Sequence, residues 1–78
     1  MADAHLEVLV EPFKENDPGP HVLAVVAAIE AEGIDADMGP FATTADGDLD
    51  AITEAAAAVV RASLDAGATA IQLRIERT

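Results

Sequence analysis

The sequence contains no cysteine, tryptophan or tyrosine among its 78 residues. The absence of cysteine excludes both a disulfide framework and metal sites built from thiolates. A domain this short buries only about 60–65% of the surface of its unfolded chain, so its hydrophobic core is small and needs support. With disulfides excluded, self-association is the favoured remedy, and we expect a homo-oligomer.

Basic residues are also scarce: four Lys and Arg stand against 15 Asp and Glu, which gives a formal net charge of −11. An acidic surface repels phosphate groups, so we expect no nucleic-acid partner and no binding to anionic membranes. Cations suit this surface better as partners, although we favour a solvated acidic surface over a specific cation site. No signal peptide and no apolar run of about 18 residues is present, and we expect a cytoplasmic protein.

Hydrophobic periodicity predicts six elements in the order β-α-β-β-α-β. Alternating apolar residues predict strands, and apolar spacings of three and four predict helices that end at glycine. The strands are expected over residues 5–11, 34–38, 41–45 and 68–77, and the helices over residues 20–32 and 49–66. The inward side chains are expected to be Leu6, Val8, Val10, Val22, Val25, Val26, Ile29, Ile34, Ala36, Met38, Leu49, Ile52, Ala56, Val59, Val60, Leu64, Ile71, Leu73 and Ile75.

This order of elements predicts an α+β, ferredoxin-like βαββαβ fold in one domain over residues 1–78. The handedness of the two crossovers places both helices on one face of a four-stranded antiparallel sheet. Asp35 and Asp37 are typical of an edge strand protected by charge. On the uncovered face a cross-strand contact between Glu7 and Arg74 is expected. That face is predicted to carry His5, Glu7, Leu9, Glu11, Gln72, Arg74 and Glu76.

Four short motifs follow one another along the chain: Glu7-Val8-Leu9-Val10-Glu11-Pro12, Pro18-Gly19-Pro20-His21-Val22, Gly39-Pro40-Phe41-Ala42-Thr43 and Asp46-Gly47-Asp48. In this order and spacing, the sequence resembles the small thiamine-binding-protein family over nearly its whole length. The resemblance implies a ferredoxin-like fold and dimers or tetramers formed through sheets. It also implies binding of thiamine or its hydroxymethylpyrimidine moiety in some members, with no established catalytic activity. Ala42 and Asp46 replace the glycine and glutamate that are usual in relatives, and these differences would alter the size of a pocket.

A thiamine-like ligand joins a flat aminopyrimidine to a cationic thiazolium. Its site needs a ring for stacking, a carboxylate near the positive charge and hydrogen-bonding groups for the pyrimidine. We expect thiamine as a possible ligand and no required cofactor. The candidate residues are Phe41 for stacking, Thr43 and Thr44 for the pyrimidine, Asp46 or Asp48 for charge, and Glu7 and Glu11 for an acidic wall.

Each candidate also has a simpler structural role. Phe41 fits a hydrophobic core, and the two threonines are good strand residues. Asp46 is explained by a turn at Asp46-Gly47, and Asp48 by capping of the second helix.

No catalytic or metal-binding pattern is present. His5 and His21 lie 16 positions apart without another ligand beside them, and both are predicted at the surface. Ser63 falls in a buried helical position without a nucleophile motif. We therefore expect a non-enzymatic, homo-oligomeric protein that binds a small cationic or heteroaromatic ligand. The alternatives are a self-associating structural or regulatory domain without a ligand, and a small ferredoxin-like isomerase or oxygenase with His5 or His21 as its base.

Overall fold

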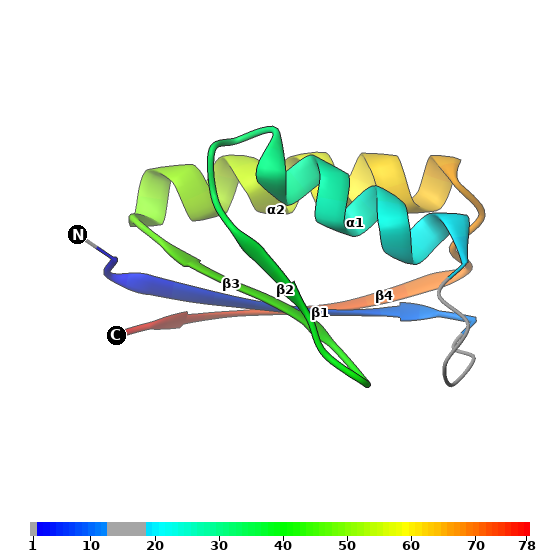
Figure 1. The fold of residues 1–78 in the computed structure, drawn as a ribbon, viewed down its shortest axis with the longest axis horizontal. Helices are drawn as coiled ribbons and strands as arrows, with labels where there is room; N and C mark the ends of the chain where they lie inside the picture. Colours follow the sequence, from blue (N-terminus) through cyan, green and yellow to red (C-terminus); the bar gives the residue numbers. More distant parts are fainter. Residues whose placement is uncertain (1, 13–18) are drawn as a thin grey trace.

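The computed structural model describes residues 2–12 and 19–78. Six elements follow in chain order: β1 (Ala4–Glu11), α1 (Pro20–Glu30), β2 (Ala36–Met38), β3 (Thr43–Gly47), α2 (Leu49–Asp65) and β4 (Ala70–Arg77). The strands form one antiparallel sheet in the order β2-β3-β1-β4. Both helices cover the same side of this sheet, and the start of β1 and the end of β4 lie at the same end of the molecule (Figure 1). The predicted ferredoxin-like fold is confirmed.

The central strand β1 has two distinct sides, because successive residues of a strand point to opposite faces. Ala4, Leu6, Val8 and Val10 are buried under the helices, as predicted for the last three. The other alternate residues, His5, Glu7, Leu9 and Glu11, face away from the helices. The other side of the sheet, called the open face below, is therefore polar over β1.

Helix α1 begins with Pro20, whose fixed φ and missing N–H suit a first helical position. His21 follows it, and the prediction of a surface position is wrong, because only 8% of this residue is exposed. Its Nε2 donates a hydrogen bond to the carbonyl oxygen of Pro12, 2.6 Å away. The ring fits beside Gly19, where a Cβ would lie 2.7 Å from the His21 Cε1 atom. The hydrogen bond thus joins the end of β1 to the start of α1.

Helix α2 begins at the predicted N-cap: Asp48 Oδ1 accepts a hydrogen bond from the backbone N–H of Ala51, 2.9 Å away. Its inner side is narrow and rich in small residues, which allows close approach to the sheet. The buried residues are Ile52, Ala55, Ala56, Val59 and Ser63. Ser63 is accommodated because its hydroxyl donates to the carbonyl of Val59 at 2.7 Å. Val60 and Leu64 were predicted inward, but they lie beside this narrow side and are exposed.

The connection from β2 to β3 differs from the prediction in register and in burial. β3 begins two residues later than expected, so Asp46 and Gly47 belong to the strand and not to a turn. Phe41 precedes it and is 66% exposed. Met38 pairs with Thr43, which places it on the helix side, yet it is 45% exposed. The reason is that β2 is a short edge strand with a neighbour on one side only.

None of the helices in the described part of the chain combines the length and apolarity needed to cross a membrane.

Candidate functional site

The open face carries a continuous row of polar side chains across all four strands. The register places Asp37 of β2 beside Thr44 of β3, Thr44 beside Glu7 of β1, and Glu7 beside Arg74 of β4. Strand pairs of this kind hold opposing side chains about 4.5–5.5 Å apart at Cβ. Glu7 therefore occupies the middle of a hydrogen-bonding and charged surface.

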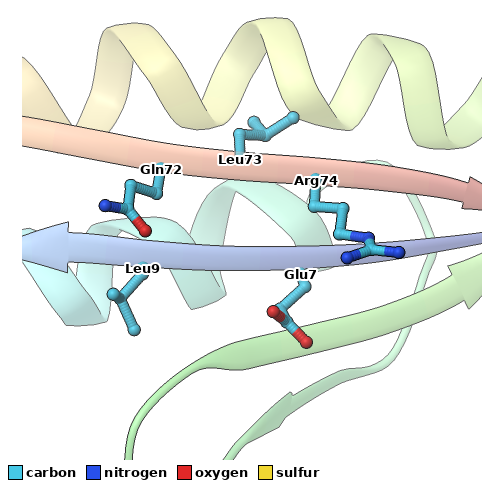
Figure 2. A pocket seen from close by; sticks show the side chains of 5 residues that line it. All are labelled: Glu7, Leu9, Gln72, Leu73 and Arg74. Carbon is cyan, nitrogen blue, oxygen red and sulfur yellow. The ribbon is translucent and has the colours of Figure 1, made fainter.

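A hollow of about 340 Å³ lies on this face between β1 and β4. Figure 2 shows Glu7 and Leu9 extending from β1, with Gln72 and Arg74 extending from the neighbouring β4. Leu73 completes the lining. The hollow thus combines an apolar contact, an amide, a carboxylate and a guanidinium within one small area. This is the mixture of groups that fixes the orientation of a small polar ligand.

Arg74 is the only arginine in this lining, and its partner is on its own strand. Its Nη2 lies 3.4 Å from Oε2 of Glu76, and both side chains are largely exposed. The predicted contact between Glu7 and Arg74 corresponds to direct cross-strand neighbours in the register. The side chain of Arg74 also extends toward the strand that carries Glu7 (Figure 2). The ion pair that Arg74 makes, however, is with Glu76.

A second pair lies next to this row on the same face. Nδ1 of His5 is 2.8 Å from Oδ1 of Asp46, which joins β1 to β3. The sequence interpretation assigned Asp46 to a turn, but the strand position makes it the direct neighbour of His5. The Asp46 carboxylate thus has a hydrogen-bond partner, while most of the surface of its side chain remains exposed to solvent.

The six predicted site residues divide between different parts of the fold. Glu7, Thr44 and Asp46 come together on the open face, and Glu11 lies on the same side at the end of β1. Thr43 is buried on the helix side, with 4% of its surface exposed, so it does not line the hollow. Phe41 lies outside the strands, before β3.

Four of the five lining residues, Leu9, Gln72, Leu73 and Arg74, were not among the predicted site residues. The alternation of β1 and β4 assigned Leu9, Gln72 and Arg74 to the open face, whereas it assigned Leu73 to the helix side. The register makes Leu9 the direct partner of Gln72, and Glu7 the direct partner of Arg74, which brings these four residues into one hollow.

Both histidines have hydrogen-bond partners. His21 is bound to the Pro12 carbonyl and His5 to Asp46. Across residues 2–12 and 19–78, no three His, Cys, Asp or Glu side chains are grouped so that they could hold a metal ion. The hollow itself offers one carboxylate, one guanidinium, one amide and an apolar contact.

Comparison with known families gives a match to the model described as thiamine-binding protein over residues 6–77. The chain belongs to this family. The match spans β1 to β4, so it includes every strand that forms the open face. No curated protein matches the chain significantly.

Solved structures of other proteins share the fold of this family member. A domain of unknown function, DUF77, from Bacillus cereus is 19% identical, with a TM-score of 0.65 over 100% of this chain and 77% of that chain. A hypothetical protein from Methanocaldococcus jannaschii is 14% identical, with a TM-score of 0.69 over 99% and 77% of the two chains. A protein from Thermotoga maritima, for which thiamine biosynthesis or salvage is the proposed role, is 18% identical, with a TM-score of 0.56 over 96% and 81%.

Proposed function

We propose that the protein is a non-enzymatic, homo-oligomeric binder of thiamine or of its hydroxymethylpyrimidine moiety, and that the ligand lies on the open face. The observation that carries the proposal is the hollow between β1 and β4 in a member of the thiamine-binding protein family. The Thermotoga maritima protein of the same fold, with its proposed role in thiamine biosynthesis or salvage, supports the same ligand class.

The size and lining of the hollow fit this ligand. Its volume of about 340 Å³ lies within the range of about 300–1,000 Å³ that is usual for small-molecule sites. Glu7 supplies the carboxylate for the thiazolium, Leu9 an apolar contact for a ring, and the amide of Gln72 both a donor and an acceptor for the pyrimidine edge. Thr44 stands beside Glu7 and adds a hydroxyl at the border of the hollow.

Long-range charge favours the same class of ligand. The net charge of −11 attracts cations to the whole surface. Around the hollow, Asp46 and Glu11 lie on the same face as Glu7 and add negative potential. Asp46 is already bonded to His5, so its contribution is charge and not a direct contact.

A homo-oligomer is part of the proposal because the hollow is open to solvent on a single copy. A flat ligand on an uncovered sheet buries only one side, whereas small-molecule sites bury about 70–90% of the ligand surface. A second copy provides the missing cover, and its contact also supports a core limited by chain length.

Isothermal titration calorimetry with thiamine and, separately, hydroxymethylpyrimidine tests the proposal. We expect saturable heat for the unaltered protein and about tenfold weaker thiamine binding for Glu7→Gln, which removes one charge without changing shape. Glu54→Gln is the matched control, since Glu54 is exposed on α2, away from the sheet. The absence of heat with both ligands up to millimolar concentration would contradict the proposal.

One observation favours a second candidate, a self-associating domain without a ligand. The guanidinium of Arg74 lines the hollow, and its positive charge opposes a cationic ligand beside Glu7. On this alternative, Glu7 and Arg74 are only cross-strand neighbours on the open face, with no ligand beside them. Oligomers whose thermal stability does not change with thiamine would support it.

A further inference from the structure

The guanidinium of Arg74 lines the hollow together with Glu7, and thiamine alone does not explain its presence. Thiamine carries a cationic thiazolium and no anionic group, so it leaves the guanidinium without a partner on the ligand. The chain has only four Lys and Arg against 15 Asp and Glu. One of these few cations lies directly beside the carboxylate of the candidate site. The hollow therefore offers a pair of opposite charges and not a single negative charge.

Arg74 is also distinctive within the open face. In the part of the chain that the structure describes, the two other arginines lie elsewhere. Arg61 is exposed on α2. Arg77 pairs with the buried Ala4, which places it on the helix side of β4. An anionic group on a ligand of the hollow therefore has one guanidinium to bind.

The ion pair of Arg74 with Glu76 is long and exposed to solvent. Its N···O distance is 3.4 Å, whereas charge-assisted N–H···O bonds are usually about 2.7–2.9 Å. The Arg74 side chain is 70% exposed, and a guanidinium has five N–H donors in a planar fork. Such a fork matches two oxygens of a phosphate group. A phosphate can therefore bind Arg74 at the cost of one long contact to Glu76.

The spacing of the two charges fits a ligand that carries both signs. Glu7 and Arg74 are direct cross-strand neighbours, so their Cβ atoms lie about 4.5–5.5 Å apart. Both side chains extend from the sheet on the same face (Figure 2). A phosphate ester of thiamine carries its phosphate on the short hydroxyethyl arm of the thiazolium, so its own opposite charges are also close together.

We propose that the hollow binds thiamine monophosphate in preference to thiamine, with the thiazolium beside Glu7 and the phosphate on the guanidinium of Arg74. This inference rests on the proposed function and specifies the ligand class of the same site. The net charge of −11 opposes an anion at long range, but exposed charges are largely screened beyond about 8–10 Å at physiological salt. The contact with Arg74 is direct and is therefore screened much less.

Isothermal titration calorimetry with thiamine and with thiamine monophosphate tests the inference through the ratio of the two Kd values. At an ionic strength of about 0.15 M, we expect the unaltered protein to bind the monophosphate about tenfold more tightly than thiamine. Arg74→Gln should abolish or reverse this preference, because Glu7 and Glu76 then repel the phosphate without compensation. Glu76→Gln leaves the guanidinium to the ligand and should increase the preference about threefold. Arg77→Gln is the matched control, since it makes the same change in charge on the helix side of β4 and should retain the preference.

The outcomes separate this inference from the proposed function. Equal affinity of the unaltered protein for the two ligands, or a preference that survives Arg74→Gln, would overturn the assignment of the phosphate to Arg74. A preference lost equally in Arg74→Gln and Arg77→Gln would overturn it as well, because net charge alone would then be responsible. Saturable thiamine heat without any preference for the monophosphate refutes this inference and leaves the proposed function standing. Absence of heat with both ligands refutes the two together.

Discussion

His5 and Asp46 lie on neighbouring strands, with 2.8 Å between Nδ1 of the imidazole and Oδ1 of the carboxylate. This pair joins β1 to β3 on the open face, 41 positions apart in the chain. The Asp46 carboxylate, which the sequence predicted as a ligand contact, is therefore already hydrogen-bonded to His5. Glu7, two residues from His5 on the same face, makes no such bond among the described residues and is the carboxylate that lines the hollow.

The first prediction separates these two carboxylates. Asp46→Asn keeps the shape and a hydrogen-bonding side chain, and we expect it to change thiamine affinity by less than about threefold, because its contribution is long-range and screened. The exposed pair with His5 contributes little to folding, so the free energy of unfolding should fall by about 1 kcal/mol or less. Calorimetry and urea denaturation measure the two effects. A loss of affinity as large as that of Glu7→Gln would show that Asp46 contacts the ligand directly.

A second prediction concerns the contact between Gly19 and His21. The backbone of Gly19 is extended, with φ −76° and ψ 176°, so alanine is allowed there on conformational grounds. Its Cβ would nevertheless lie 2.7 Å from the buried His21 ring. We expect Gly19→Ala to lower the free energy of unfolding by about 1–3 kcal/mol through overpacking.

The matched experiment is a double-mutant cycle with His21→Ala. Removing the ring loses the hydrogen bond to Pro12 but also removes the clash, so the double variant should be more stable than the sum of the two single losses predicts. Strictly additive losses in the free energy of unfolding, measured by urea denaturation, would mean that the Cβ at position 19 and the His21 ring do not clash.

The third prediction tests the start of α2. Asp48→Ala removes the acceptor for the Ala51 N–H and should lower the free energy of unfolding by about 1 kcal/mol. Asp50 lies in the same first turn and interacts with the helix only through its charge, so Asp50→Ala should cost about half as much. Urea denaturation at a fixed protein concentration compares the two variants. Equal losses would assign the effect of Asp48 to charge alone.

The fourth prediction concerns the core. Leu6 is completely buried at the centre of β1, and Leu6→Ala should lower the free energy of unfolding by about 3 kcal/mol. That loss is a large part of the total free energy of unfolding of so small a domain. Leu23→Ala is the control, because Leu23 is exposed on α1 and should change stability by about 0.5 kcal/mol or less. Similar losses for both leucines would indicate that the outer side of α1 is covered in solution.

The order of elements and the two faces of β1 followed from the sequence because they depend on local periodicity. Glu7 is polar and its neighbour Val8 is apolar, so alternation alone predicts that they point to opposite faces of the sheet. The N-cap at Asp48 was also predictable from local sequence, because its side chain accepts a hydrogen bond from the backbone N–H of Ala51, three residues later.

The errors involve residues whose environment depends on distant parts of the chain. His21 is buried because the Pro12 carbonyl, directly after β1, accepts a hydrogen bond from its Nε2–H, and no local pattern encodes that partner. Met38 has the polarity of a core residue, but its position on a short edge strand leaves it exposed. The start of β3 depends on which of its residues pair with β1. The observed strand begins two residues later than predicted, so Asp46 lies in the strand beside His5 and not in a turn.

The sequence predicted the types of residue that form the site, but it did not predict which residues line the hollow. Acidic residues on the uncovered face were expected from alternation, and Glu7 is among them. Alternation places the adjacent Thr43 and Thr44 on opposite sides of the sheet, but which of them faces outward depends on the register with β1. The hollow itself arises from the β1–β4 register, which brings Leu9 opposite Gln72.

The most direct test of the account is a map of backbone amide chemical shifts in isotopically labelled protein during titration with thiamine. We expect the largest saturable changes at residues 7, 9, 72 and 74, with smaller changes at 44 and almost none along the exposed side of α2. Saturable changes confined to the helices, or no changes at millimolar thiamine, would contradict a thiamine site on the open face.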